Sequence, residues 1–491
     1  MKVACPNTGD PVLPQSQPRQ PTGAPQNTYG SLVMTLCHGD NRRMRDDAPD
    51  ELTGLALRVG AEARAAGLSR DVPNRDPRLD DLAGSLPSFR DFRSAMASLD
   101  FFVPFYGDAA QDRLALAWVY ASASDGEVDS TWAEFWDRLC DPTWTYAAVA
   151  HLLNYESDCD LAAFPDGLEV RVRSLRALSD ILGWSQQDLQ ATLGSDFAGF
   201  GVGRFVVVYR ESVPKSPAML VTGNTGGETI AIRRLLQALR LTAGGDVNVG
   251  RIYHCRVRPV VPDLGIMMSW SSLDRAPGPA YVLGQGNIAD VRETYDLCRR
   301  FDGRIDTYPQ ITAAVGRLSS AYDRSLGGLQ DRIIDDFVGL EALVGSDQEL
   351  AYKLAIRVSG LLAETDEDRI VLFKRVKSFY DTRSKIVHGG ALRPTHQANV
   401  QAEPELRDIL RRLLLGFLRL TDSANTRPTR KFVEEQLDEV LLDTKRRSAL
   451  RGAMGLLPAR LAQQNTGQQG AALWSEHDPA GFVAGPPAPE A

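Results

Sequence analysis

The feature that most constrains the fold is a run of helical segments between residues 305 and 424. Five segments here place apolar residues at three- and four-residue steps, which is the spacing of one face of an α-helix. In the second, Ile333, Phe337, Leu340 and Val344 form one stripe. Because short connections make consecutive helices antiparallel neighbours, the sequence predicts an all-α bundle. We expect this bundle to extend over residues 305–452. The five segments are 308–325, 328–345, 346–364, 366–388 and 404–424.

Two of these segments carry signals for a helix start. Ser346, followed by Glu349 three residues on, is typical of a capping box at the start of the third segment. The fourth segment begins with acidic residues, which the positive end of the helix dipole favours in a first turn.

The remainder of the chain predicts two further structured regions and therefore a multidomain protein. Residues 47–165 read as a helical region, including a continuous helical pattern over 130–155 that carries Trp132, Trp136 and Trp144. We expect these tryptophans to pack into a core, because no basic residues interleave with them as they would in a base-stacking surface.

Residues 166–262 predict an α+β region. Strand-like runs occupy 167–175, 203–212 and 251–261, and a helical pattern over 228–245 ends at Gly244 and Gly245. Two glycine-rich stretches, 199–204 and 222–229, are better explained as loops than as phosphate-binding turns. The first precedes a strand, and the second lacks the lysine of a phosphate loop.

Three remaining segments lack a core-forming pattern. We interpret residues 263–304 as a connector with a Pro/Gly-rich middle. Residues 1–30 and 453–491 read as disordered tails, because their polar, Pro- and Gly-rich composition buries too little apolar surface to order the chain. Met34 is an alternative to Met1 as the initiator.

Composition narrows the function classes. The formal net charge of −8 argues against a general nucleic-acid-binding surface, so such binding would need a local basic patch. The six cysteines form no CxxC pair and no zinc spacing with a histidine, which favours reduced thiols in a cytoplasmic protein without a metal or other cofactor. The sequence contains no run of about 18 apolar residues, so it predicts no membrane-spanning helix. The GxSxG and HExxH motifs are absent.

The stretch FYDTRSKIVHGG, residues 379–390, raises the question of function. Arg383 lies in line with an apolar stripe, and the polar residues Lys374, Lys377, Asp381 and Lys385 lie opposite as a solvated face. A buried guanidinium needs a partner. Glu341 is one candidate, and an incoming anion is the other. The apolar stripe consists of Phe373, Val376, Tyr380 and Val387.

His388 and Gly389 end the same helix. Glycine just past a helix is the usual left-handed cap, which places His388 in the last turn or at the cap. On a continuous helix Arg383 and His388 would lie about 140° apart. If the helix unwinds at His388, the imidazole can swing toward the arginine. In the simpler interpretation, the histidine stabilises the helix end and the arginine reaches out to solvent.

Local charge favours a phosphate-rich ligand. Residues 369–393 hold seven basic residues against Asp381 alone, a net of +6 within an acidic chain. A histidine near neutral pKa can act as base or acid, and an arginine can hold a phosphate. For Ser384 two alternatives are equally supported: its hydroxyl donates a hydrogen bond to a phosphate oxygen, or it caps the helix locally.

Several of these segments together resemble the HEPN superfamily. The second helix RIIDDFVGLEALVG, the third with KLAIRVSGLLA, and FYDTRSKIVHGG are similar to its Apea-like group, whose signature is a tyrosine, Arg-Ser and His-Gly. Arg383, Ser384 and His388 fit the wider motif of an arginine, four to six residues and a histidine. The resemblance covers about residues 305–424.

The resemblance implies a dimeric helical bundle in which two Arg/His pairs share a cleft. Many family members with this motif are metal-independent ribonucleases, often in toxin or anti-phage roles, whereas others bind nucleotides or RNA or serve as partners. We therefore expect an endoribonuclease with Arg383, His388 and Ser384 in its catalytic site. Lys377, Lys385 and Tyr380 would contact RNA or phosphate, and Glu341 would support Arg383.

Two alternatives remain open at this point. The first is a non-catalytic module that binds RNA or a nucleotide and couples to a partner protein, with residues 47–262 as the region that would contact that partner. The second is a structural dimerisation scaffold. The Arg/His pair and the basic segment favour the ribonuclease and the binding module over the scaffold.

Overall fold

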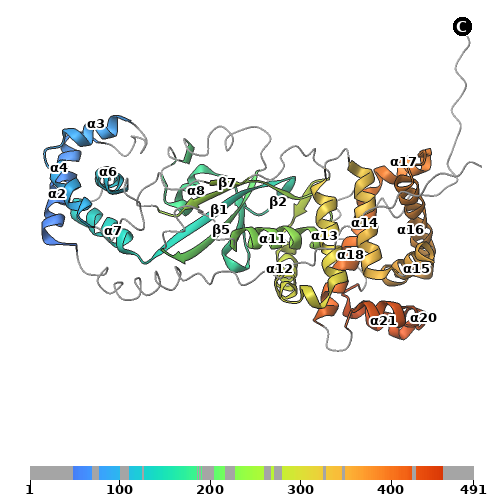
Figure 1. Cartoon of the computed structure of the whole chain (residues 1–491). Helices are drawn as coiled ribbons and strands as arrows, with labels where there is room; N and C mark the ends of the chain where they lie inside the picture. Colours follow the sequence, from blue (N-terminus) through green and yellow to red (C-terminus); the bar gives the residue numbers. More distant parts are fainter. Residues whose placement is uncertain are drawn as a thin grey trace, which may run out of the picture.

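The computed structural model describes most of the chain between residues 48 and 456. The described residues are 48–68, 77–99, 110–123, 127–184, 186, 189–190, 204–215, 227–258, 267–269, 279–324, 328–345, 349–422 and 427–456. They form an N-terminal group of helices, a central antiparallel sheet and a C-terminal helical bundle, arranged in that order (Figure 1). Residues 1–30 and 457–491 of the predicted tails 1–30 and 453–491 lie outside the described residues, as do most of the two glycine-rich stretches. Residues 453–456 are described, and Ala453 is the last residue of a helix.

The N-terminal helices pack around a cluster of aromatic rings. Trp118 and Trp132 meet edge to face with their centroids 4.9 Å apart, and Trp136 and Phe135 are buried beside them. The indole N–H of Trp118 donates to the Ala56 carbonyl at 2.9 Å, which satisfies it inside the core. The core role of Trp132 and Trp136 is confirmed. The helices are α2 (Asp50–Ala65), α3 (Pro77–Ser85), α4 (Phe89–Ala97), α6 (Ala110–Ser122) and α7 (Val128–Cys140).

The predicted helix over 130–155 is wrong in its second half. Helix α7 stops at Cys140, and strand β1 (Thr143–Leu153) follows. Pro142 disfavours helical geometry at the residue before it, which ends the helix. Trp144 is buried on this strand, not on a helix. Because both faces of β1 are covered, its residues form one apolar run, which periodicity cannot distinguish from a buried helix.

The central sheet has six antiparallel strands in the order β3-β4-β5-β1-β6-β7. Helix α11 (Gly227–Thr242) covers one face, packing on Ala148, Ala150 and Leu152 of β1. Helix α8 (Leu175–Leu182) packs on the opposite face, against Ala147 and Val149. The other strands are β3 (Leu161–Ala163), β4 (Leu168–Val172), β5 (Phe205–Pro214), β6 (Asn248–Arg256) and β7 (Met267–Ser269). The predicted α+β region is thus confirmed, and its sheet also takes in β1.

The predicted connector 263–304 is regular structure over much of its length. Strand β8 (Tyr281–Leu283) pairs in parallel with β2 (Tyr155–Ser157), and helix α12 (Ile288–Asp302) packs against α11. Val291, Tyr295 and Cys298 are buried at helical spacing, a pattern that the preceding Pro/Gly-rich segment obscured. Short 3₁₀ helices precede and follow α12 at η4 (Gln285–Asn287) and η5 (Ile305–Thr307), and a third, η3 (Pro165–Gly167), lies between β3 and β4.

The C-terminal bundle follows the predicted helices closely. Ile333, Phe337, Leu340 and Val344 of α14 are fully buried, as their stripe predicted. Helix α17, between α16 and α18, was not predicted. The bundle comprises α13 (Pro309–Asp323), α14 (Leu329–Val344), α15 (Leu350–Leu362), α16 (Asp366–Val387), α17 (Pro394–Gln401) and α18 (Glu403–Thr421). The short helices α19 (Arg430–Glu435), α20 (Leu437–Leu442) and α21 (Thr444–Ala453) follow.

Of the two predicted helix starts, one is wrong and one is confirmed. Helix α15 begins at Leu350, and Glu349 before it has a left-handed backbone with φ 50°, so Glu349 cannot be the third residue of a helix opened by Ser346. Ser346 itself lies outside the described residues. Helix α16 has acids throughout its first turn, and Thr365 and Asp368 cap each other reciprocally.

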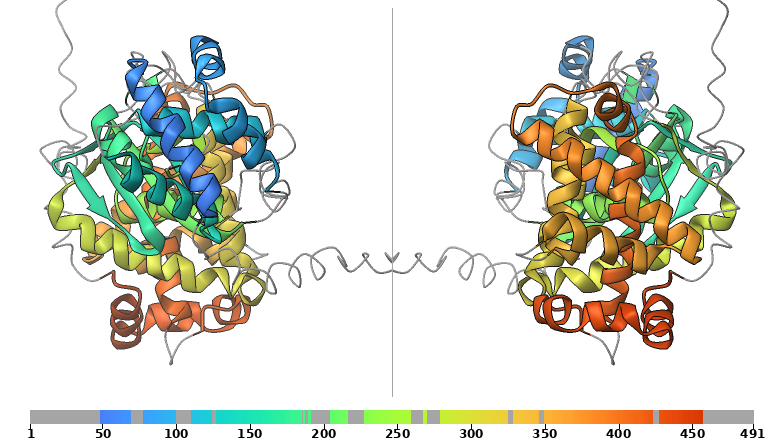
Figure 2. Two further views of the ribbon diagram at one scale, coloured as in Figure 1. Left: turned by 90° about the vertical axis from the view of Figure 1, so that its left-hand side faces the viewer. Right: turned by 90° about the vertical axis from the view of Figure 1, so that its right-hand side faces the viewer.

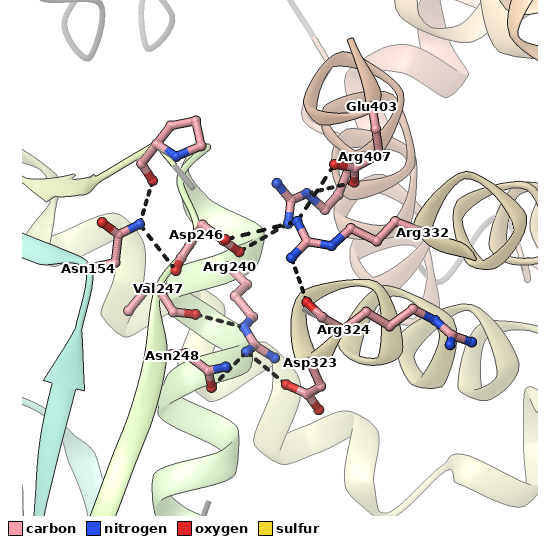
Figure 3. A network of polar contacts seen from close by, with 11 residues as sticks. Asn154, Arg240, Asp246, Val247, Asn248, Asp323, Arg324, Arg332, Glu403 and Arg407 are labelled. Carbon is pink, nitrogen blue, oxygen red and sulfur yellow. Dashed lines mark hydrogen bonds and ion pairs between the residues drawn. The ribbon is translucent and has the colours of Figure 1, made fainter. Parts of the chain in front are cut away.

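A buried charge cluster joins the central sheet to the bundle (Figure 3). Asp246, just before β6, accepts from Arg407 of α18 at 3.2 Å and lies 4.0 Å from Arg332 of α14. Glu403 of α18 lies 3.4 Å from Arg407 and 3.8 Å from Arg332. All four side chains are buried, so the cluster balances two cations with two anions away from water.

A fifth buried group, Asp336, adds a proton to this cluster. Burial, and next the negative charge of Glu403, hold the pKa of Asp336 well above its ordinary value. Glu403 lies between two guanidiniums and is the anion of the pair. We infer that Asp336 is the protonated carboxyl that donates to Glu403, since a third buried negative charge would be uncompensated.

No helix within the described residues is both long enough and apolar enough to span a bilayer. This finding agrees with the sequence, which contains no long apolar run.

The protonation of Asp336 generates a prediction about stability and pH. Because the pKa of Asp336 is raised in the folded state, folding takes up a proton. The contribution of Asp336 to the free energy of unfolding is therefore lost as the pH rises from about 4 through the folded-state pKa. In Asp336→Asn the side-chain amide can still donate a hydrogen bond to Glu403, but it does not titrate. We expect the free energy of unfolding at pH 7 to rise by about 1–3 kcal/mol, with no such gain near pH 4, in denaturant titrations at both pH values.

The neighbouring Asp335 provides the matched control. It is buried and forms ion pairs with Arg317, at 3.1 Å, and with Arg324. Asp335→Asn should therefore lower stability at pH 7, where Asp336→Asn raises it. If both substitutions destabilise the protein equally at pH 7, the assignment of the proton to Asp336 is wrong.

Candidate functional site

The candidate site lies at the C-terminal end of α16, where the chain turns toward α17. His388 is the capping residue of α16, and Gly389 follows with φ 65° in the left-handed region. The Gly390 N–H donates to the Lys385 carbonyl at 2.9 Å, which closes the helix end. The predicted glycine cap is confirmed.

The buried face of α16 is not the predicted stripe. The helix buries Leu372, Val376, Phe379 and Thr382, whereas Val387 is 47% exposed. Helix α16 packs against α14 and α15, and α17 covers it near Thr382, where the Asn399 amide donates to the Thr382 hydroxyl at 2.9 Å. Tyr380 and Arg383 therefore lie half-buried at the flank of the core, not at its centre.

Arg383 pairs with the predicted partner. Its Nη2 lies 3.5 Å from Oε1 of Glu341 on α14, and both side chains are 21% exposed. Its guanidinium also lies over the Tyr380 ring, 5.7 Å from the centroid, and that ring meets Phe337 edge to face. Burial raises the pKa of Glu341, and the positive charge of Arg383 opposes that shift.

His388 is exposed, and its imidazole makes no hydrogen bond or ion pair with another described residue. Its backbone, with φ −89° and ψ 9°, continues from a helix that runs unbroken to Val387. The helix does not unwind to turn this ring toward Arg383. The two side chains leave α16 about 140° apart, the separation expected for a continuous helix.

The other predicted residues divide between two faces of α16. Lys377, Ser384 and His388 share one face by helical spacing. Lys377 and Lys385 are exposed and Ser384 is half-buried. The ammonium of Lys377 lies 5.5 Å from the Phe373 ring. The structure thus brings Arg383, Tyr380 and Glu341 together, and it places the histidine with the lysines.

The structure also contains a histidine–carboxylate pair that the sequence interpretation missed. Nε2 of buried His396 lies 2.9 Å from the Asp381 carboxylate, and its Nδ1 accepts from the Arg393 N–H at 3.2 Å. The pair fixes the turn between α16 and α17, which carries Gly389 and Gly390. Pro394, at the first position of α17, was the available signal for this helix.

Tertiary contacts reduce the basic character of residues 369–393. Arg369 pairs with Asp366, Arg375 with Glu405 at 2.6 Å, and Arg383 with Glu341. Counting these three carboxylates as well as Asp381, the seven cations leave a net charge of +3, half the value counted along the sequence. The exposed remainder consists of Lys374, Lys377, Lys385 and Arg393.

Among the residues that the structure describes, no group of three His, Cys, Asp or Glu side chains is arranged to hold a metal ion. Comparison of the chain with protein-family models, with curated proteins and with solved structures finds no match. The HEPN resemblance therefore continues to depend on the residues of this sequence.

The Arg383–Glu341 pair can be tested by a double-mutant cycle. Arg383→Met leaves Glu341 half-buried without its partner, so we expect a loss of about 1 kcal/mol in the free energy of unfolding. Glu341→Gln in the Arg383→Met background should restore part of that loss, which urea titrations of the four proteins would measure. Additive effects of the two substitutions would show that the pair contributes no coupling energy.

Proposed function

We propose that the protein is a metal-independent endoribonuclease of the HEPN type, acting as a homodimer in a toxin or anti-phage role. The observation that carries the proposal is the exposed imidazole of His388 at a helix end, on the same helix as the partly buried Arg383. The Tyr-x2-Arg-Ser-x3-His-Gly pattern of the HEPN resemblance supports it.

In this proposal His388 transfers protons and Arg383 holds phosphate. His388 removes the proton from a ribose 2′-oxygen, which attacks the adjacent phosphorus and displaces the 5′-oxygen. The departing 5′-oxygen needs a proton as well, and the second His388 of a dimer supplies it. Arg383 stabilises the charge that builds on the phosphate oxygens, since a guanidinium fork matches two of them.

The pairing of Arg383 with Glu341 has a consequence for this mechanism. A phosphate that binds Arg383 competes with a carboxylate 3.5 Å away, so substrate binding exchanges one anion for another. The raised pKa of Glu341 favours that exchange, because a protonated Glu341 releases the guanidinium. Lys377 and Lys385 are exposed on the face of His388, where an RNA backbone would bring further phosphates.

A second candidate is a non-catalytic module that binds RNA or a nucleotide and couples to a partner protein. The separation of Arg383 from His388 around α16 favours this alternative, because one protomer alone does not aim both groups at one phosphate. The N-terminal helices and the sheet would then supply the surface for the partner.

Cleavage assays distinguish the two candidates. With purified protein and labelled RNA we expect cleavage that persists in EDTA and leaves 2′,3′-cyclic phosphate and 5′-hydroxyl ends, because the attacking group is the 2′-oxygen. His388→Ala and Arg383→Ala should each lower the rate by about 10²–10⁴-fold. DNA of the same sequence, lacking the hydroxyl, should bind and stay intact.

Lys374→Ala is the matched control, since Lys374 is an exposed cation of α16 outside the proposed site. It should change the cleavage rate little. Circular dichroism melts of all three variants separate loss of activity from loss of fold. If RNA binds tightly, depends on Arg383 and is never cut, the binding module replaces the nuclease.

The composite site requires two copies of the chain. We expect light scattering at micromolar concentration to give a mass near twice the 53.8 kDa of one chain. Mixing His388→Ala protein with the original protein should lower the activity more than simple dilution does, because a mixed dimer has only one of the two His388 side chains that the mechanism needs. A strict monomer that still cleaves RNA would contradict the shared site.

A further inference from the structure

Tyr352 of α15 is the only exposed aromatic side chain among the residues that the structure describes, with 51% of its surface open to solvent. Its ring meets the Phe373 ring of α16 edge to face, with the centroids 5.7 Å apart, and the ammonium of Lys377 lies 5.5 Å from the Phe373 centroid. Helices α15 and α16 pack against each other at the end of the molecule away from the N-terminal helices (Figures 1 and 2). An exposed ring beside a cation is typical of surfaces that bind unpaired bases.

The contact between Tyr352 and Phe373 lies on the face of α16 that carries His388. The side chains of this face recur at steps of four, seven and four residues: Phe373, Lys377, Ser384 and His388. Phe373 and His388 are 15 residues apart on one helix, which is roughly 22 Å. Tyr352 is therefore too far from His388 to take part in the chemistry, but a few nucleotides of one strand would span the distance.

The exposed charges of α16 between Phe373 and His388 are mostly positive. The two arginines of this stretch already have carboxylate partners. Three exposed lysines face one exposed carboxylate, three minus one or a net of +2, and these residues are Lys374, Lys377, Lys385 and Asp381. Glu349 and Lys353, at the start of α15, add one charge of each sign. The positive stretch ends beyond Phe373, where the first turn of α16 holds Asp366, Glu367 and Asp368.

We propose that Tyr352 stacks on an unpaired base of an RNA strand whose backbone follows α16 toward His388. The inference rests on the proposed function for the identity of the ligand, and it adds a residue and a form of substrate. Bases within a duplex already stack on their neighbours, so the substrate is single-stranded. A protein is the competing occupant, because Ile356 and Ile370, one turn from the two rings, are 37% and 57% exposed. The excess of cations along the same face favours RNA.

Binding of labelled oligonucleotides to the full chain tests the proposal without depending on cleavage. Fluorescence anisotropy is measured with a single-stranded DNA, which lacks the 2′-hydroxyl, with the same strand made abasic, and with its duplex. Tyr352→Ala should weaken binding of the single strand about 5- to 150-fold, the effect of losing one stack between a base and an aromatic ring. It should leave binding of the abasic strand and of the duplex unchanged, because neither offers an unpaired base.

Two further substitutions of Tyr352 separate stacking from apolar contact. Tyr352→Trp keeps an aromatic face and should bind the single strand as tightly as the original protein. Tyr352→Leu keeps an apolar side chain without that face and should bind as weakly as Tyr352→Ala. Circular dichroism melts check that each variant is folded, which we expect because the side chain that changes is exposed.

Ile356→Ala is the matched control, since Ile356 is an exposed apolar residue one turn further along α15. It should bind the single strand as the original protein does. The proposal is overturned if Tyr352→Leu binds normally, or if Ile356→Ala loses as much affinity as Tyr352→Ala, and either result indicates a docking surface for a protein. Absence of any binding overturns both this proposal and the proposed function. Binding that depends on the aromatic ring, in a protein that never cuts RNA, supports the stacking role and removes only the nuclease.

Discussion

The buried charge cluster between Asp246, Arg332, Arg407 and Glu403 is the interaction on which the arrangement of the molecule depends. It joins the loop before β6 to α14 and α18, so the sheet and the bundle share one polar core (Figure 3). Removing one partner of a buried ion pair leaves an uncompensated charge, at a cost of about 3–5 kcal/mol. The relative position of sheet and bundle is therefore specified by charge as well as by apolar contact.

Helix α14 connects this cluster to the candidate site. Arg332 and Asp336 lie in its first half and face the junction, whereas Glu341, five residues beyond Asp336, holds Arg383. A helix is stiff over so short a distance, so the position of Glu341 follows from the contacts that fix Asp336. The middle region thus bears on the candidate site through one shared helix.

Sequence reasoning succeeded where local pattern and tertiary environment agree. The apolar stripe of α14, the acidic first turn of α16 and the glycine that ends α16 each depend only on residues a few positions away in the chain. It failed at β1, whose two covered faces give an apolar run without alternation. It also missed α17, a short helix for which Pro394 marks the start but whose weak apolar pattern does not reveal the face of α16 that it covers.

The helical bundle, the α+β character of the middle region, the cap at His388 and the candidate pairing of Arg383 with Glu341 all follow from the amino-acid sequence. Which charges are neutralised depends instead on the packing of distant segments. Glu405 lies 30 residues from Arg375, and Asp246 lies 161 residues from Arg407, so no periodicity relates these partners. The same holds for Asp381 and His396. Helix formation depends on neighbours in the chain, whereas charge balance depends on neighbours in space.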